Sequence, residues 1–481
     1  MFTKPTLPIM ALALAATVSS SHAVPSPVQV LAFQVFTASR DSAALTRNFP
    51  PEEGDGAEEV DDVIHAIGTV GIEDRRLGFI FGPLAFDDSD ERVRMLIRGA
   101  FGIALGRNVA IGFHLDDSMF WDRLPLLNKP ENIEWLDWNG TPNTGRRLDW
   151  SSVPTKIMAQ LCLNSPAVED AVRKRAALIG KEAARGMTML RARGRANLFI
   201  GVIAGWETQI GRDFDTGRCL GYHALTNRGY SAGNPPANMD KARVAIAQEF
   251  VDLWAAALAE AGVPDEKIYS HIAFMSRASF EATRFGQPGR LPGTYLETIN
   301  FTPPSASFGA HHRPGFSTYP QFGFLEQIQA ELARNGNPPW ASAEGTAVDP
   351  GAAEQGSPGF PMEKYLGNLF SRGAAFVNVF GWGVGSASNP FRRIAESANA
   401  VSAYRRFLRG EVLPSDPPAQ VPSPLFFDKM RKLQRSLPQY LAKQGPEKVE
   451  HLYGDLDRDL KAQLYVDAEQ AVDGILQAIT P

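Results

Sequence analysis

Two glutamates stand at the ends of apolar segments that have the length and composition of strands. Glu207 ends the segment 197–207, and Glu344 lies near the end of the segment 339–345. Hydrolysis of a glycosidic bond needs two carboxyl groups, one that protonates the leaving oxygen and one that attacks the anomeric carbon or activates water. In parallel α/β barrels, reactive residues gather where the strands end. The pair therefore predicts glycoside hydrolysis, for which we expect no cofactor.

The neighbours of the two glutamates suit two different roles. Glu207 follows Trp206, and an indole beside a carboxyl group lowers the local polarity, which favours the protonated acid. Glu344 lies between an alanine and a glycine, which leave room for an anomeric carbon. A nucleophile must be ionised, so we expect hydrogen-bond donors near Glu344, such as the Asn300 amide or a tyrosine. We predict Glu207 as the general acid/base and Glu344 as the nucleophile.

A third strand-like segment, 109–117, ends in His114-Leu-Asp116-Asp117. Side chains alternate along a strand, so His114 and Asp116 should both face the barrel interior. We expect these two to hydrogen-bond substrate hydroxyls and Asp117 to hold the following loop. Imidazole and carboxylates can also bind a divalent metal ion. The other histidines lack metal-ligand spacing, however, and we predict no metal.

Further candidates for substrate binding lie at predicted strand ends and in loops. Sugar rings have apolar faces that stack on aromatic side chains, and their hydroxyls need a few convergent polar groups. The long segment after 109–117 is rich in tryptophan, and the segment 208–238 is polar and rich in glycine. Besides those at the third strand end, the predicted substrate-binding residues are Trp121, Trp206, Asp213, His223, Asn227, Asn300 and Trp382.

These residues need a scaffold in which strands alternate with helices. The strand-like segments are 28–36, 77–82, 109–117, 197–207, 268–274, 295–301, 339–345 and 376–383, with amphipathic helical segments between most of them. Eight such strands, the last followed by a helix, predict an α/β fold of the (β/α)8 TIM-barrel type. An open doubly wound sheet is the alternative, because no sequence pattern shows closure.

The chain divides into four predicted parts. Residues 1–23 contain Lys4, an apolar run, and the small residues Ser21 and Ala23, which predict a signal peptide cleaved after Ala23 and a secreted or periplasmic protein. The barrel catalytic domain covers 24–410 and a proline-rich connector covers 411–424. A small C-terminal helical appendage covers 425–481, which we expect to be two helices packed on the barrel.

Counted along this predicted barrel, Glu207 ends the fourth strand and Glu344 the seventh. In this placement the chain resembles the clan of retaining (β/α)8-barrel glycoside hydrolases, in which the acid/base ends strand four and the nucleophile ends strand seven. The resemblance covers most of 28–409 and implies a hydrolase of O-glycosyl bonds that retains the anomeric configuration. It rests on an architecture and two residues. The clan usually has Asn before the acid/base, where this sequence has Trp206.

The composition of the chain indicates which classes of partner it binds. The 48 Lys and Arg against 53 Asp and Glu give a net charge of −5, which shows no basic bias that would predict nucleic-acid binding. No segment after residue 23 approaches the length of a membrane span. The two cysteines could form one disulfide in an exported protein. The predicted partner is an oligo- or polysaccharide. The alternatives are a non-catalytic glycan-binding protein on the same scaffold and a metal-dependent hydrolase.

Overall fold

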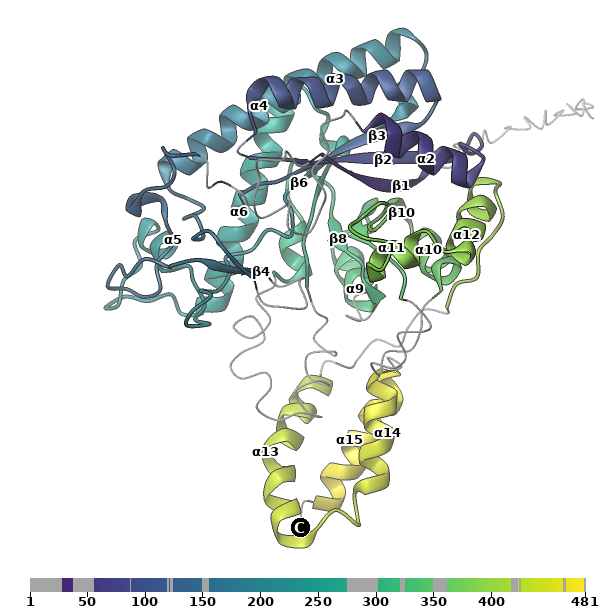
Figure 1. Ribbon diagram of the computed structural model, residues 1–481. Helices are drawn as coiled ribbons and strands as arrows, with labels where there is room; N and C mark the ends of the chain where they lie inside the picture. Colours follow the sequence, from purple (N-terminus) through teal and green to yellow (C-terminus); the bar gives the residue numbers. More distant parts are fainter. Residues whose placement is uncertain are drawn as a thin grey trace, which may run out of the picture.

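Eight parallel strands form the centre of the molecule (Figure 1). The computed structural model describes residues 28–37, 56–86, 88–118, 121, 124–148, 155–274, 302–320, 325–348, 361–416, 423, 425–461 and 464–479. The strands are β1 (Gln29–Phe36), β2 (Arg75–Leu84), β3 (Ala110–Leu115), β6 (Phe199–Ala204), β7 (Ile268–Ser270), β8 (Gly315–Ser317), β9 (Trp340–Gly345) and β10 (Ala374–Val379).

The strands close almost completely into a barrel. Their order is β7-β6-β3-β2-β1-β10-β9-β8, and each neighbouring pair is parallel. The two end strands are joined by parallel bridges between Tyr269 and Arg313 and between Ile272 and Phe316. The predicted (β/α)8 barrel is therefore confirmed, and the open doubly wound alternative is wrong.

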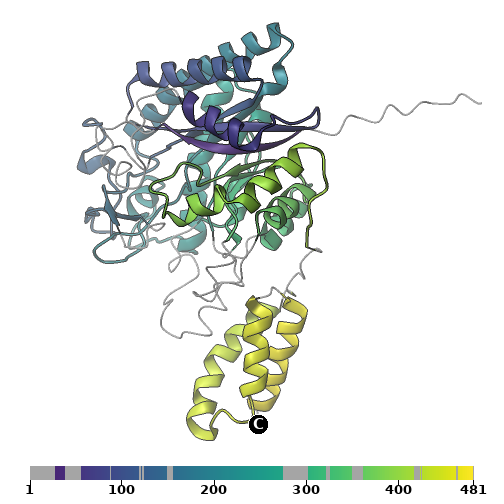
Figure 2. The ribbon, with the colours of Figure 1, turned by 45° about the vertical axis from the view of Figure 1, so that its right-hand side comes forward.

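Helices cover the outside of the barrel (Figures 1 and 2). They are α2 (Ala57–Ile67), α3 (Asp90–Arg107), α4 (Pro166–Ala192), α6 (Met239–Glu260), α9 (Leu325–Arg334), α10 (Met362–Ser371), α11 (Pro390–Ala395) and α12 (Ala398–Leu408). Serines fix the starts of two of these helices: the Ser89 hydroxyl accepts from the Arg92 amide in α3, and the Ser165 hydroxyl accepts from the Val168 amide in α4. Helices α3, α4 and α6 lie side by side.

The long connections after β3 and β6 pack against each other beside the barrel. The first contains an antiparallel pair, β4 (Arg146–Leu148) and β5 (Thr155–Ile157), and the second contains the short helix α5 (Tyr222–Asn227). An antiparallel bridge between Arg146 and Asp213 joins the two connections. They therefore form one folded unit next to the mouth of the barrel.

The barrel wall has two sides that differ in chemistry. Outward side chains form one large apolar core with the helices, as Leu31 and Phe33 do in β1. The interior holds a smaller apolar cluster, which consists of Val30, Ala32, Ile80, Ala110, Ile200, Ile203, Tyr269, Ala341, Ala343 and Phe376. Strict alternation of side chains along 197–207 predicts Ile200 on the helix side, but it faces inward, because the β3–β6 register shifts between Ile111 and Gly112.

The sixth strand lies later in the chain than the sequence predicts. The segment 295–301 lies outside the described residues, and β8, Gly315–Ser317, takes the sixth place, between β7 and β9. The fourth strand is also shorter than expected. It ends at Ala204, so Glu207 lies on the loop that follows and not on the strand itself.

The C-terminal region is a bundle of three helices. These are α13 (Phe426–Gln444), α14 (Glu450–Lys461) and α15 (Tyr465–Ile479), one more than the sequence predicts. Apolar side chains such as Met430, Leu433 and Ile475 give the bundle a core of its own. Both views show it beside the barrel and not laid along its outer wall (Figures 1 and 2). Within the described part of the chain, no helix has the length and hydropathy that a membrane span requires.

Candidate active site

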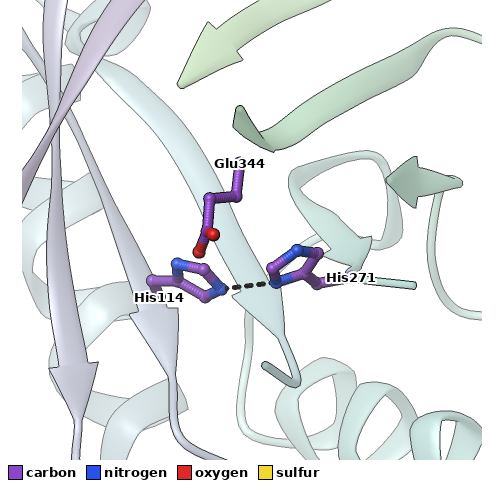
Figure 3. Close-up of side chains that lie close together, drawn as sticks. All are labelled: His114, His271 and Glu344. Carbon is purple, nitrogen blue, oxygen red and sulfur yellow. Dashed lines mark hydrogen bonds between the residues drawn. The ribbon is translucent and has the colours of Figure 1, made fainter. Parts of the chain in front are cut away.

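Polar side chains from five strands or strand ends replace the apolar interior at one end of the barrel. They are Gln34 of β1, His114 of β3, His271 directly after β7, Glu344 of β9 and Asn378 of β10, all buried. Parallel strands end at the same edge, so the fold brings these side chains together. Figure 3 shows three of them, with the Glu344 carboxyl group beside the two imidazoles.

Glu207 reaches this group from an unusual backbone conformation. Its φ is 55°, in the left-handed region, and the chain turns there directly after Gly205, whose φ is 102°. A non-glycine residue in this region costs about 1–3 kcal/mol, and such strain gathers at functional sites. The turn directs the carboxyl group to β8, where the Ser317 hydroxyl donates to Glu207 Oε1 at 2.8 Å.

Glu344 owes its position to a local irregularity in β9. Sequence alternation places Trp340, Ser342 and Glu344 on one face, but Trp340 packs outward and the Ser342 hydroxyl bonds Thr318 and Tyr365. The β8–β9 and β9–β10 registers both shift near Ala343. This shift turns the Glu344 side chain inward, toward the histidines. The expectation that the three residues share a face is therefore wrong.

The surroundings of Glu344 set its charge. The Tyr319 hydroxyl donates to Glu344 Oε1 at 2.6 Å, which fulfils the expectation of a tyrosine donor. The other oxygen, Oε2, is buried and has no hydrogen-bond partner among the described residues. Burial, and then the negative charge of Glu207, raise the pKa of Glu344 well above its usual range, whereas Tyr319 lowers it.

Two buried histidines connect this pair of carboxyl groups. His114 Nε2 lies 2.9 Å from His271 Nδ1, and His271 Nε2 lies 2.8 Å from the Ser317 hydroxyl. On the other side, His114 Nδ1 lies 3.1 Å from Gln34 Oε1. Burial lowers the pKa of His114 well below its usual range and that of His271 to about 3. Burial therefore disfavours the cationic form of both imidazoles.

His114, His271 and Glu344 also form a donor set that could hold a metal ion. One ligand atom of each lies within 4.8 Å of the others. Imidazole nitrogens and a carboxylate oxygen suit Zn²⁺ and other transition metals. The distance of 2.9 Å between the ring nitrogens equally fits an N–H···N hydrogen bond.

The aspartates that follow β3 hold the backbone. Asp116 is buried, and its Oδ2 accepts from the Phe86 amide at 3.3 Å. Asp117 accepts from the Thr208 hydroxyl, one residue after Glu207, and burial raises the pKa of Asp117. Asp117 thus ties the end of the third strand to the loop that carries Glu207.

Several residues predicted to bind substrate have contacts within the fold. Trp121 is buried, and its indole donates to the Ala159 carbonyl. Asp213 accepts from Thr144 and Thr216, and His223 stacks on Trp135. Asn227 is exposed on α5 and bonds Asn164. The structure does not bring these residues to the two glutamates, and Asn300 lies outside the described residues.

The two tryptophans at strand ends lie nearer to the site. The Trp206 ring stacks on His114, with centroids 4.1 Å apart and planes 5° apart, so it packs the histidine and not Glu207. Trp382 is half-buried, contacts the Phe33 ring edge-on, and lines a small pocket with Gln34 and Glu59. Trp382 thus lines a pocket next to Gln34 of the site.

Five members of the site were not predicted from the sequence: Gln34, His271, Ser317, Tyr319 and Asn378. Inward alternation in 28–36 and 268–274 could have found Gln34 and His271. The pair Ser317 and Tyr319 was hidden because the sixth strand was placed at 295–301. The two cysteines, whose pairing the sequence left open, are both free.

Comparisons with known proteins give no family. No family model matches the chain, and no curated protein matches it. Among solved structures, the chain is similar to the catalytic domain of β-amylase from Paenibacillus polymyxa, with 9% identity, a TM-score of 0.44, and coverage of 80% of this chain and 99% of that chain. The chain is also similar to the carboxyl transferase domain of Rhizobium etli pyruvate carboxylase, solved with pyruvate, with 11% identity and a TM-score of 0.31. That match covers 95% of this chain and 63% of the other. Likenesses this distant say nothing about what the chain does.

Proposed function

We propose that this chain is an exported glycoside hydrolase in which Glu207 is the general acid/base and Glu344 the nucleophile. One observation carries the proposal. Glu207, on the loop after the fourth strand, and Glu344, near the end of the seventh, lie at one mouth of the barrel. Each accepts a hydrogen bond from a hydroxyl of the β8 segment, Ser317 on Glu207 and Tyr319 on Glu344. A glycosidase needs such a pair of carboxyl groups.

The two carboxyl groups hold one proton between them under this proposal. The charge of Glu207 raises the pKa of Glu344, so removing the last proton from the pair is costly. The Tyr319 hydroxyl donates a hydrogen bond to Glu344, and this bond stabilises the ionised form of Glu344. The proposal places the proton on Glu207, which then protonates the leaving oxygen while ionised Glu344 attacks the anomeric carbon. Burial raises the pKa of Glu344 and so opposes its ionisation, and the hydrogen bond from Tyr319 offsets part of this effect.

The test uses mature protein and a panel of aryl glycosides and polysaccharides, with product anomers followed by NMR. Glu344→Ala should abolish turnover, and azide should restore it with the inverted anomer. Glu207→Ala should spare substrates with good leaving groups, which need no proton. Wild-type rates in both variants, on a substrate that the protein cleaves, would contradict the assignment. Glu344→Ala without a glycosyl azide product would favour the inverting mechanism.

A metal-dependent hydrolase is the second candidate, favoured by the set of His114, His271 and Glu344. In that enzyme a bound ion would activate water and Glu344 would be a ligand. Dialysis against a chelator separates the two candidates. The glycosidase should keep its full rate, whereas the metal enzyme should lose it and regain it with Zn²⁺ or Mn²⁺.

A further inference from the structure

Glu207 stands between two neighbours that the fold holds firmly. The Trp206 ring stacks on His114, with the ring centroids 4.1 Å apart. Thr208 is buried and makes three hydrogen bonds with its side chain and backbone. Glu207 itself has a φ of 55°, a conformation that costs free energy for a residue with a side chain. Such a conformation persists only where its surroundings hold it, so these two neighbours maintain the turn at Glu207.

The three hydrogen bonds of Thr208 tie it to three different segments of the chain. Its hydroxyl donates to Asp117 Oδ2, after β3. Its backbone amide donates to the His271 carbonyl, 3.3 Å away and directly after β7. Its own carbonyl accepts from the Thr302 hydroxyl at 2.7 Å. The amide, the carbonyl and the hydroxyl are all engaged, so Thr208 cannot move without leaving buried polar groups unpaired.

Gly205 leaves the space that the Thr208 side chain fills. Its φ of 102° lies in the left-handed region, which glycine adopts without strain. A Cβ atom added at Gly205 would lie 2.4 Å from the Thr208 hydroxyl oxygen, closer than such atoms approach in proteins. The segment from Gly205 to Thr208 is therefore a tight turn in which the first residue allows the last one to reach Asp117.

We propose that Thr208 is a positioning residue, which together with Asp117 and Thr302 holds the strained turn and so determines where the Glu207 carboxyl group lies. We call Asp117, Thr208 and Thr302 the threonine clamp. The inference rests on the proposed function, in which Glu207 is the general acid/base. A general acid must lie within hydrogen-bond reach of the leaving oxygen. A displaced Glu207 therefore slows the step that needs its proton and leaves the attack by Glu344 intact.

Without the threonine clamp, the backbone at Glu207 is free to relax to the usual negative φ. The left-handed turn directs the carboxyl group to β8, where the Ser317 hydroxyl donates to Glu207 Oε1 at 2.8 Å. A change of φ rotates the side chain about the backbone, so this hydrogen bond breaks. Glu344 is held by Tyr319 from the β8 segment, and the nucleophile should stay in place.

The first test measures the position of Glu207 without any substrate. Crystal structures of the wild type are compared with those of Thr208→Val, which keeps the shape of the side chain and removes the hydroxyl. In Thr208→Val, Glu207 should leave the left-handed region and lose its contact with Ser317. Thr208→Ser, which keeps the hydroxyl, should retain both features. A Thr208→Val structure in which Glu207 has not moved would overturn the proposal.

The second test measures kcat/KM on aryl glycosides whose leaving groups differ in acidity. With poor leaving groups, Thr208→Val should lose about tenfold to a hundredfold, because a displacement of about 1 Å can cost that much. With good leaving groups, which need no proton, the loss should stay within about threefold. Thr302→Val removes another hydrogen bond of the threonine clamp and should change both measurements in the same direction. It carries both tests if Thr208→Val does not fold.

Thr37→Val is the matched control, because Thr37 is a buried threonine directly after β1 whose hydroxyl donates to the Pro83 carbonyl at 2.8 Å. It should lower stability to a similar extent and keep the leaving-group dependence of the wild type. Equal losses on good and poor leaving groups in Thr208→Val and Thr302→Val would refute the positioning role while the glycosidase stands. If the wild type cleaves no glycoside, the proposed function fails, and the crystal structures still decide whether the threonine clamp holds Glu207.

Discussion

At the scale of single residues, Glu344 is held in an environment that makes its charge costly. It is buried, it lies near a second carboxyl group, and one of its oxygens has no hydrogen-bond partner. The Tyr319 hydroxyl is the described side-chain donor that offsets this cost. A nucleophile has to be ionised, so under the proposed mechanism the activity depends on this one hydrogen bond.

Tyr319→Phe should therefore weaken the nucleophile and not the acid. Losing a hydrogen bond to a buried group costs about 1–3 kcal/mol, which corresponds to roughly a tenfold to a hundredfold loss in kcat/KM. The pKa of Glu344 rises further without the donor, so the acidic limb of the pH profile should move to higher pH. The alkaline limb should stay in place. Steady-state kinetics from pH 4 to pH 9 measure both limbs.

Tyr365→Phe serves as the control for this prediction. Tyr365 is equally buried, but its hydroxyl bonds Thr318 and Ser342 and not the carboxyl group. It should lower stability without moving the acidic limb. Equal pH profiles for the two variants would show that Tyr319 does not act on the charge of Glu344.

The sequence predicted which glutamates meet but not how each reaches the site. Strand counting placed Glu344 near the end of the seventh strand, where it lies, and Glu207 at the end of the fourth, whereas the structure has Glu207 on the loop after β6. Strict alternation failed in β9, where the register shift near Ala343 turns Glu344 away from the face of Trp340 and Ser342. A bulge depends on the partner strands, which a single segment does not reveal.

At the scale of elements, one of the shortest strands, β8, had the largest consequence. β8 has three residues and follows Pro314, so it lacks the alternating run by which strands are predicted. It nevertheless carries Ser317 and leads to Tyr319, which contact the two glutamates. The long apolar strands were predicted well because their pattern is set by burial on both faces. The short polar strand was missed because its stability comes from its neighbours.

Another element depends on one buried carboxyl group, that of Glu134 in the connection after β3. It accepts from the backbone amides of Trp135, His223 and Ala224, and so fixes the start of α5. Burial is the largest influence and raises the pKa of Glu134 to about 7 despite these donors. The folded protein therefore binds a proton here that the unfolded chain releases above about pH 4.5.

Glu134 should thus make the protein less stable as the pH rises from about 4.5 to about 7, with no further loss above that range. A shift from 4.5 to about 7 corresponds to about 3 kcal/mol. Glu134→Gln resembles the protonated acid and should lose this dependence, so its stability relative to the wild type should increase between pH 5 and pH 8. Urea unfolding at several pH values measures the difference. Glu131→Gln changes an exposed neighbour, and its unfolding free energy should depend on pH as that of the wild type does. If the unfolding free energy of Glu134→Gln shows this same dependence, the role of Glu134 is contradicted.

At the scale of the whole molecule, we predict that the first 23 residues are removed on export. These residues lie outside the described part of the chain, so the argument is the sequence alone: a lysine, an apolar run, and Ser21 and Ala23 at the small positions of a cleavage site. N-terminal sequencing of protein from its native compartment should begin at Val24. Soluble protein that still begins with Met1 would contradict the prediction.

The barrel and the C-terminal bundle have separate hydrophobic cores, and we expect them to unfold separately. Leu433 of α13 is fully buried in the core of the bundle. Leu433→Ala should destabilise the bundle by about 2–5 kcal/mol, because the lost side chain leaves a cavity. The barrel should keep its own transition, and kcat/KM should not change. Thermal unfolding followed by circular dichroism, with activity measured on the same samples, resolves the two units.

Lys432→Ala, an exposed change on the same turn, should leave both transitions in place. If Leu433→Ala lowers the barrel transition and the activity together, the bundle is part of the catalytic unit and the two cores unfold as one.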